Sequence, residues 1–274
     1  MKFVKMLLVF FSFTLLNAQE VKFKGEFKQG NLVFAFAENL KEVLLDDKIV
    51  PNDENGNFIL GFDRNDTTEH LLTIKLINKT ILKKFIPEKV KYNIQRINGM
   101  EQKYVEAPQE ELPRIEKERE ISKAAREKVG NVKDALFLKG FVKPINGGRI
   151  SSVFGNQRIL NGTPKNFHNG IDIASPTGTP VLAMTDGVVH LSADNFYYSG
   201  NYILLDHGLG LNSFYLHLSK SFVKDGQVVN KGEIIGEVGT TGRSTGPHLH
   251  WGVQWFDERV DPNTVFNFVE KKIK

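Results

Sequence analysis

The chain contains no cysteine in its 274 residues, which excludes disulfide bonds and a lipid-carrying N-terminal cysteine. After the first 20 residues it also lacks any apolar run long enough to cross a membrane. The net charge is only +4, and there is no basic stripe of the kind that nucleic-acid-binding proteins carry, so we expect no nucleic-acid partner. The chain has 41% hydrophobic and 25% charged residues, a composition typical of a globular protein held together by packing.

The N-terminal segment has the layout of a secretory signal. Lys2 and Lys5 precede an apolar run over residues 6–16, and the small residue Ala18 follows it. Because the run is short for a membrane span and ends at a small residue, residues 1–18 are predicted to be a cleaved signal peptide. An uncleaved N-terminal anchor is the alternative. We therefore expect a periplasmic or secreted mature protein.

Residues 19–105 alternate apolar and polar side chains in short runs such as VKFKGEF, NLVFAFA and LLTIKLI. Turn-forming residues, for example Gln29-Gly30-Asn31, separate these runs. The pattern predicts a small antiparallel β domain. Its only histidine, His70, is isolated, so we interpret the domain as an accessory module without chemistry of its own.

Residues 106–140 are predicted to form a helical linker, with the helix over residues 108–129. One stripe of apolar side chains follows helical spacing: Leu112, Ile115, Ile121, Ala125 and Val129. Acidic and basic residues alternate over the rest and largely cancel, which favours a solvated face over a binding patch. We expect the apolar stripe to pack on a neighbouring domain.

Residues 141–274 are rich in glycine and in short, closely spaced strand-like runs such as NYILLDH and EIIGEVG. This pattern predicts a compact β-sandwich or barrel-like fold. Six of the seven histidines lie here, so we expect the chemistry of the chain in this region. The expected fold class is mainly β: a compact antiparallel β domain preceded by a small β domain and a linker helix.

The segment HNGID places His168 four residues before Asp172. Gly170 and its β-branched neighbours oppose a helix, and a straight strand would separate the two side chains by roughly 13 Å. His168 is therefore expected on a loop that folds back at Gly170, with Asp172 at the start of a strand.

The segment HLH places His248 and His250 on one face of a strand, about 7 Å apart, with the leucine between them facing a core. This separation suits one metal ligand and one neighbour that reaches a metal-bound water. His217, in SFYLHLS, is expected on the face opposite Phe214 and Leu216, where it is free to point into a cleft. Imidazole is well suited to acid-base chemistry near neutral pH.

Two imidazoles and a carboxylate that converge, with a spare imidazole beside them, are the donor set of a catalytic zinc site. Either motif alone is weak evidence, because an isolated histidine in a β domain is more often a hydrogen-bonded structural group. That is our interpretation of His190 and His207. Both motifs in one glycine-rich region, with another histidine on a strand between them, favour a Zn²⁺ site.

The segment from Gly147 to Pro262 resembles the LytM/lysostaphin-type zinc metallopeptidases, which cut peptide cross-links in bacterial cell walls. The resemblance runs in order through ISSVFGNQR, HNGIDIASPTGTPVLAMTDGVV, GNYILLDHGLGLNSFYLHLS, VVNKGEIIGEVGTTGRSTGPHLHWGV and VDP. It implies that residues 141–274 form a LytM-like catalytic domain, and no motif position departs from the active pattern.

By position, the resemblance also implies roles for individual residues. The implied zinc ligands are His168, Asp172 and His250. The implied catalytic histidines, which activate the water and stabilise the oxyanion, are His217 and His248; which of them is the base stays open. Cleft-side positions without an assigned role are Asn156 and Arg158.

The resemblance implies a zinc endopeptidase that hydrolyses peptidoglycan cross-links, with D-Ala-to-diamino-acid bonds as the expected target, in wall remodelling or cell shape. We expect the protein to be a monomer. The N-terminal region resembles, more loosely, the accessory part of Gram-negative cell-shape endopeptidases, so intramolecular inhibition is a further hypothesis. A non-catalytic wall-binding module that activates another hydrolase is the main alternative, and the intact ligand set argues against it. A secreted lysin aimed at glycine bridges is a second alternative.

Overall fold

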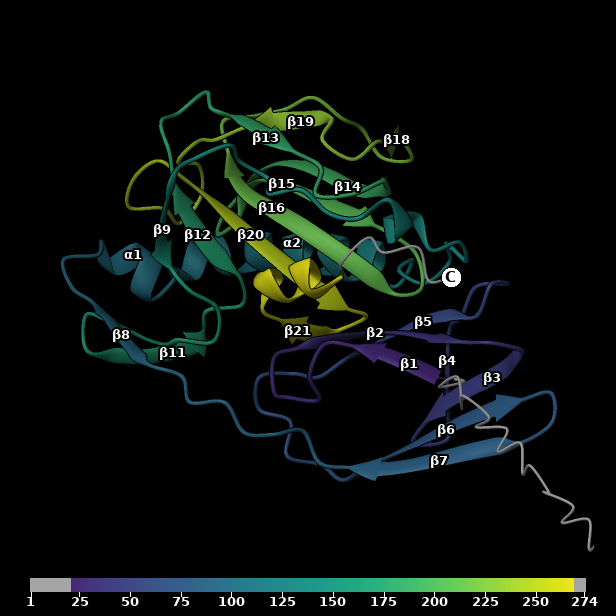
Figure 1. Cartoon of the computed structure of the whole chain (residues 1–274). Helices are drawn as coiled ribbons and strands as arrows, with labels where there is room; N and C mark the ends of the chain where they lie inside the picture. The colour runs from purple at the N-terminus through teal and green to yellow at the C-terminus, as the bar shows by residue number, and fades with distance from the viewer. Residues whose placement is uncertain (1–20, 269–274) are drawn as a thin grey trace, which may run out of the picture.

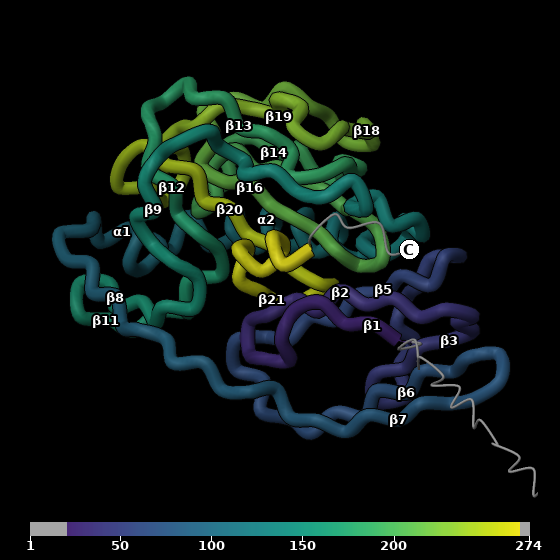
Figure 2. Tube along the Cα trace, in the orientation of Figure 1, coloured from purple at the N-terminus to yellow at the C-terminus, as the bar shows by residue number. Residues whose placement is uncertain are grey.

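The computed structural model describes residues 21–268, so the predicted signal peptide at residues 1–18 lies outside the described residues. Over 21–268 the protein is mainly β, as predicted, and nearly all strand pairs are antiparallel. Within this part of the chain, no helix has both the length and the apolarity needed to cross a membrane. Figures 1 and 2 show the strands β1–β7 gathered in one half of the molecule and the C-terminal strands in the other.

Two small antiparallel sheets form the N-terminal half. The first has the order β1-β2-β5, with bounds Val21–Lys24, Leu32–Ala37 and Asn57–Gly61. The second has the order β4-β3-β6-β7, with bounds Lys48–Val50, Leu40–Leu45, His70–Leu76 and Thr80–Phe85. Alternate apolar side chains, such as Phe58 and Leu72, are buried between them. Burial alternates along β6, whereas β2 and β5 are buried on both faces.

An eight-stranded antiparallel sheet forms the C-terminal half. Its order is β18-β14-β15-β16-β20-β12-β9, and β21 pairs with β20. The bounds in that order are Val228–Val229, Gly187–Phe196, Gly200–Asp206, Leu211–Leu218, His248–Trp255, Ile171–Ala174, Arg149–Ser152 and Glu258–Val260. The long strands β16 and β20 are almost wholly buried, which makes them the rigid centre of the region.

Two three-stranded sheets flank the large one. The order β13-β19-β17 comprises Pro180–Leu182, Ile234–Glu237 and Lys220–Ser221. The order β11-β10-β8 comprises Thr163–Phe167, Gln157–Leu160 and Ile94–Ile97. Strand β8 pairs with β10 in parallel, and the chain after β7 crosses the molecule as a long extended segment to reach it (Figure 2). The N-terminal region thus contributes a strand to the C-terminal half.

The helices are short apart from one. Their bounds are Gln102–Val105 for α1, Leu112–Arg126 for α2, and Gln109–Glu111, Leu136–Lys139 and Pro262–Asn267 for the 3₁₀ helices η1, η2 and η3. Helix α2 lies behind the large sheet in Figure 1, and its Ala125 is buried in a cluster with Leu191 and Phe214.

The predicted apolar stripe docks only at its C-terminal end. Ala125 and Val129 are buried, whereas Leu112 and Ile121 are 42% and 38% exposed. Polar contacts hold the rest of the helix: a carboxylate oxygen of Glu118 accepts a hydrogen bond from the backbone of Tyr197 at 2.7 Å. Because charged side chains make these contacts, an apolar pattern could not reveal the docked face.

The two halves share one hydrophobic core. The ring of Phe34, on β2, lies 5.6, 5.8 and 5.0 Å from the ring centroids of Phe137, Phe141 and Phe268. Buried residues of both halves form a single contiguous cluster. The N-terminal half is therefore packed onto the rest of the protein and is not merely tethered to it.

Candidate metal centre

Two neighbouring strands and one turn bring the three predicted ligands together. Strands β12 and β20 pair with Asp172 directly opposite His250. His168 follows β11, and the chain folds back into β12, as predicted. A Cβ atom at Gly170 would lie 2.4 Å from the carbonyl oxygen of Trp251 and 2.8 Å from Nε2 of His250. Only glycine therefore permits this turn without moving the site.

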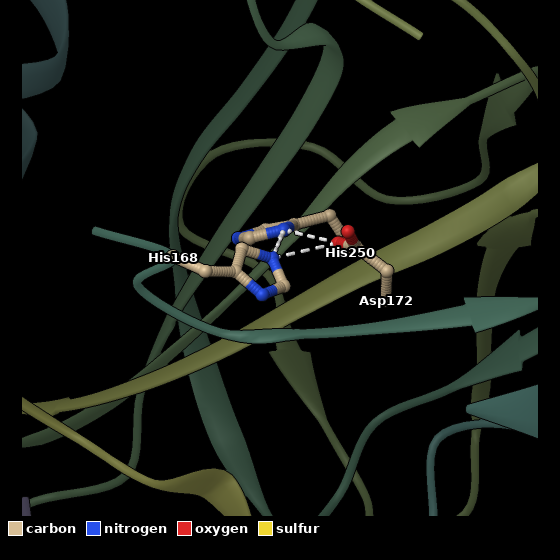
Figure 3. A group of neighbouring side chains, drawn as sticks. All are labelled: His168, Asp172 and His250. Atoms are coloured by element: carbon tan, nitrogen blue, oxygen red, sulfur yellow. Dashed lines mark hydrogen bonds and ion pairs between the residues drawn. The ribbon is translucent and has the colours of Figure 1, made fainter. Parts of the chain in front are cut away.

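The three side chains point toward one another (Figure 3). Oδ1 of Asp172 lies 2.9 Å from Nε2 of His168 and 2.7 Å from Nδ1 of His250, and the two nitrogens are 3.0 Å apart. All three residues are buried. Across residues 21–268, this is the only group of three His, Cys, Asp or Glu residues whose donor atoms lie within 4.8 Å of one another.

The arrangement of these donor atoms suits binding of a divalent cation better than hydrogen bonding among the three side chains. Nδ1 of His168 lies 2.9 Å from the carbonyl oxygen of Val153, which can only accept, so Nδ1 donates and Nε2 carries a lone pair. That lone pair faces the carboxylate of Asp172. A cation between the donors would turn this repulsive contact into an attractive one, and two nitrogens with one carboxylate are a catalytic zinc set.

The electrostatics keep the donors in the protonation states that a metal needs. Burial acts to raise the pKa of Asp172, but the neighbouring imidazoles of His168 and His250 hold that pKa well below its usual value. Burial lowers the pKa of His250 to about 4. At neutral pH the site therefore offers a carboxylate and a neutral imidazole.

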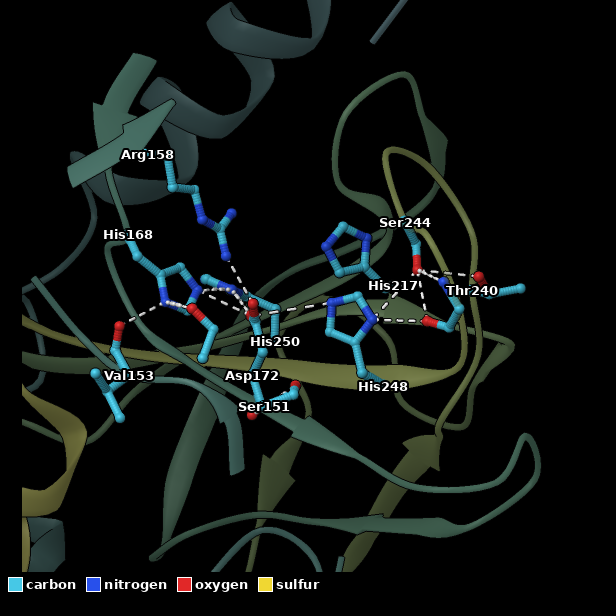
Figure 4. Close-up of polar contacts among 12 residues, drawn as sticks. Ser151, Val153, Arg158, His168, Asp172, His217, Thr240, Ser244, His248 and His250 are labelled. Atoms are coloured by element: carbon cyan, nitrogen blue, oxygen red, sulfur yellow. Dashed lines mark hydrogen bonds and ion pairs between the residues drawn. The ribbon is translucent and has the colours of Figure 1, made fainter. Parts of the chain in front are cut away.

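His217 and His248 form a second pair beside the three donors (Figure 4). Their ring centroids are 4.8 Å apart. Nδ1 of His217 lies 2.9 Å from the carbonyl oxygen of Thr241, and Nδ1 of His248 lies 2.8 Å from that of Gly246. Each Nδ1 therefore donates, which leaves a lone pair on each Nε2. Burial, reinforced by the charges of His248 and His250, lowers the pKa of His217 to about 3, so it is a neutral base at neutral pH.

His217 reaches the cleft through a break in the strand pattern. Leu216 lies directly opposite His250, so regular alternation would turn the next residue to the other face, with the fully buried Tyr215. Instead the register of β15 on β16 shifts here, and His217 adopts a left-handed φ of 63°. The expectation that alternation sets His217 opposite Phe214 and Leu216 is therefore wrong, because this bulge returns its ring to the face of His250.

Three polar residues surround the donors, and the sequence had assigned none of them a role. Arg158 donates from Nη2 to Oδ2 of Asp172 at 2.6 Å. Ser152 Oγ lies 3.0 Å from Nδ1 of His168 and donates to Oε1 of Gln95 at 2.8 Å. Gln95 reaches this position only because β8 pairs with β10, and no local signal in the sequence announces a pairing between strands that far apart.

The remaining candidates lie outside the group of donors. His207 is fully buried and hydrogen-bonded at both ring nitrogens, and His190 sits near a buried aspartate, in agreement with structural roles for both. His70 is held by two aspartates in the N-terminal half. Asn156 accepts a hydrogen bond from the backbone of His168 through its own backbone carbonyl, at 2.8 Å.

A cavity of about 660 Å³ opens over this group. Its lining includes four basic residues, Arg158, Lys165, Arg243 and Arg259. The N-terminal region adds three residues to the same lining, Gln95, Ile97 and Met100. The site is therefore an open, basic cleft and not a closed structural centre.

A model of peptidase family M23 matches residues 166–262, the segment that contains all five predicted site residues. Residues 166–262 therefore form a peptidase M23 domain. A crystal structure described as a peptidase M23 from Pseudomonas aeruginosa resembles it with a TM-score of 0.65 and 28% identity, covering 88% of this chain and 96% of that one. The likeness to this M23 protein therefore extends well beyond the matched segment.

Two curated relatives each match less than half of this chain. Peptidoglycan DD-endopeptidase ShyA of Vibrio cholerae is 50% identical over 104 residues, which are 38% of this chain and 24% of ShyA. The DD-carboxypeptidase/endopeptidase Mpg of Neisseria meningitidis is 41% identical over 124 residues, 45% of this chain and 28% of Mpg. The chain thus spans less than a third of the length of these two relatives.

Proposed function

We propose that the protein is a zinc-dependent endopeptidase that hydrolyses peptide cross-links of bacterial peptidoglycan. The observation that carries this proposal is the cluster of His168, Asp172 and His250 at a cleft that His168 and Asp172 line together with two further imidazoles. Relatives named as peptidoglycan DD-endopeptidases support the substrate class. We propose D-Ala-to-diamino-acid bonds as the target, and residues 141–274 as the catalytic domain.

His168 through Nε2, Asp172 through Oδ1 and His250 through Nδ1 would hold the zinc ion. When bound, zinc polarises the scissile carbonyl and brings the pKa of a water toward neutrality. Arg158 holds the second oxygen of the Asp172 carboxylate, which leaves Oδ1 oriented toward the two nitrogens.

His217 and His248 would transfer the proton and stabilise the developing charge. Each ring is oriented by a backbone carbonyl at Nδ1, so Nε2 is preset in the cleft before substrate arrives. One imidazole takes the proton of the attacking water at Nε2. The imidazolium so formed donates a hydrogen bond to the developing oxyanion and then gives the proton to the leaving amine.

We further propose that the protein acts as a monomer in the periplasm or after secretion, where peptidoglycan lies. We also propose that its N-terminal region, as an accessory domain at residues 19–105 with a linker at 106–140, limits access to the cleft. The positions of Gln95, Ile97 and Met100 in the cleft lining support this second proposal.

Digestion of purified sacculi, followed by mass spectrometry of the fragments, tests the reaction. Cross-linked fragments are expected to decline, a chelator should stop the reaction, and added zinc should restore it. His250→Ala should lose both bound zinc and cleavage, whereas His70→Gln, a histidine outside the cleft, should keep both. Full cleavage by metal-free His250→Ala would sink the mechanism, and bound zinc without cleavage would favour a non-catalytic wall-binding module.

A further inference from the structure

Arg243 is a cation in the cleft that has no anionic partner among residues 21–268. It lies in the loop between β19 and β20, and it lines the cavity together with His217 and His248. Its guanidinium carbon stacks 4.5 Å from the ring centroid of Tyr198, and Nη1 makes one long contact, 3.4 Å, to the carbonyl oxygen of Tyr104. Within residues 21–268, no carboxylate forms an ion pair with it.

This arrangement costs free energy in the absence of an anion. Burial lowers the pKa of Arg243, and the charge of Arg158 lowers it further. A guanidinium that is partly removed from water loses hydration, and a carboxylate or phosphate normally compensates for that loss. Such a group at the wall of an open cleft is therefore explained by an anion that arrives with a ligand.

The loop holds Arg243 in place. Its backbone N–H donates to the carbonyl oxygen of Tyr198 at 2.9 Å. Next to it, a Cβ atom at Gly242 would lie 2.3 Å from the backbone nitrogen of Gly200, so the loop is closely packed on the start of β15. Because the backbone and one face of the guanidinium are fixed, little conformational entropy is lost when its free edge binds a ligand.

The net charge of the cleft also favours an anionic ligand. Of the residues that the structure describes, four basic ones line the cleft, and the only acidic one is Asp172. That carboxylate already contacts Arg158, His168 and His250. The remaining positive charge, including that of Arg243, is uncompensated by cleft residues and would attract an anionic substrate.

We propose that Arg243 binds a free carboxylate of the peptide substrate and thereby selects cross-links that carry one beside the scissile bond. The planar guanidinium can donate two parallel hydrogen bonds to a carboxylate, and its stacking on Tyr198 leaves an edge free to do so. The inference rests on the proposed endopeptidase function and names the group that this cleft recognises. The carboxylate next to the linking amine of a diamino acid has the required chemistry.

Two synthetic cross-linked peptides test the proposal on the full chain. They are identical except that the diamino acid bears a free carboxylate in one and a carboxamide in the other. The zinc-loaded wild type should prefer the carboxylate peptide by about 10- to 100-fold in kcat/KM, the range expected for a charged hydrogen-bonded contact. Arg243→Gln should abolish this preference by slowing only the carboxylate peptide.

Two variants serve as controls. Arg243→Lys keeps the charge without the two-point geometry, so it should retain part of the preference. Lys165→Gln removes another basic residue from the same cleft lining, and it should leave most of the preference intact. An equal loss on both peptides in Arg243→Gln, or abolition of the preference by Lys165→Gln, overturns the assignment.

Calorimetric binding of both peptides to the zinc-free protein separates this inference from the proposed reaction. The carboxylate peptide should bind at least tenfold more tightly, and Arg243→Gln should equalise the two. Such binding without hydrolysis by the zinc-loaded protein would contradict the endopeptidase function and uphold Arg243 as the carboxylate site. Hydrolysis without preference overturns the Arg243 assignment alone, and no binding with no hydrolysis overturns both.

Discussion

At the scale of single residues, the five site residues fall into two groups, which differ in the atoms that their polar side-chain atoms face. His168 and His250 each face the buried oxygen of Asp172, whereas His217 and His248 each face a backbone carbonyl. The first arrangement needs a cation between the groups, and the second is complete without one. The two sets should therefore respond differently to substitution.

His248→Ala and His217→Ala should keep bound zinc and lose turnover by about 10²- to 10⁴-fold, because each removes an acid-base group and no metal donor. Asp172→Ala should lose zinc as well as turnover. Zinc stoichiometry and kcat, measured on the same preparations, check this difference. A parallel loss of zinc and turnover in His248→Ala would make His248 a ligand.

At the scale of secondary-structure elements, local sequence patterns predicted local geometry well, whereas pairings between strands far apart in the sequence could not be predicted. The turn at Gly170 and the shared face of His248 and His250 follow from local geometry, and both are present. The orientation of His217 depends on a bulge between β15 and β16, which alternation cannot anticipate. Gln95 reaches the metal centre only through the pairing of β8 with β10.

The junction of β3 and β6 contains a pH-dependent contact. Burial acts to lower the pKa of His70, but hydrogen bonds to Asp46 and Asp66, at 2.6 and 2.8 Å, raise that pKa above its usual value. A raised folded-state pKa stabilises the protein fully below the unfolded value of about 6.5. This stability is lost as the pH rises through the folded-state value.

His70→Gln should therefore lower the free energy of unfolding by about 1–2 kcal/mol at pH 5.5 and by clearly less at pH 9. Urea denaturation at the two pH values checks this. Asp66→Asn, which removes one partner, should show the same trend. An equal loss at both pH values would mean that His70 acts by packing on Phe62 and Phe85 and not by charge.

At the scale of the whole molecule, the shared core decides how the role of the N-terminal half can be tested. Deleting it would expose Phe137, Phe141 and Trp255, which it covers, so loss of stability would mask any gain in access. A milder change is available at the segment beside the cleft. The side chain of Asn161 holds the backbone of Met100 through two hydrogen bonds, of 2.7 and 3.1 Å.

Asn161→Gly should loosen this segment while keeping the left-handed φ of 46° that position 161 requires. If the segment limits access, sacculus digestion should rise several-fold with little change in Tm. Asn39→Gly, the same substitution at an exposed left-handed residue in the N-terminal half, is the matched control and should leave digestion unchanged. Equal digestion rates for both variants and the wild type would reject restricted access.

The pairing of Asp172 with His250 has a further consequence for a chain that has no cysteine. The two residues are 78 positions apart, so an ion bound to both would close a loop of that length, as a covalent cross-link would. In polymer terms, such a closure removes on the order of 4 kcal/mol of chain entropy from the unfolded state. The bound metal would then act as a reversible cross-link of the fold. It would form in the compartment that supplies zinc and be lost wherever zinc is scarce.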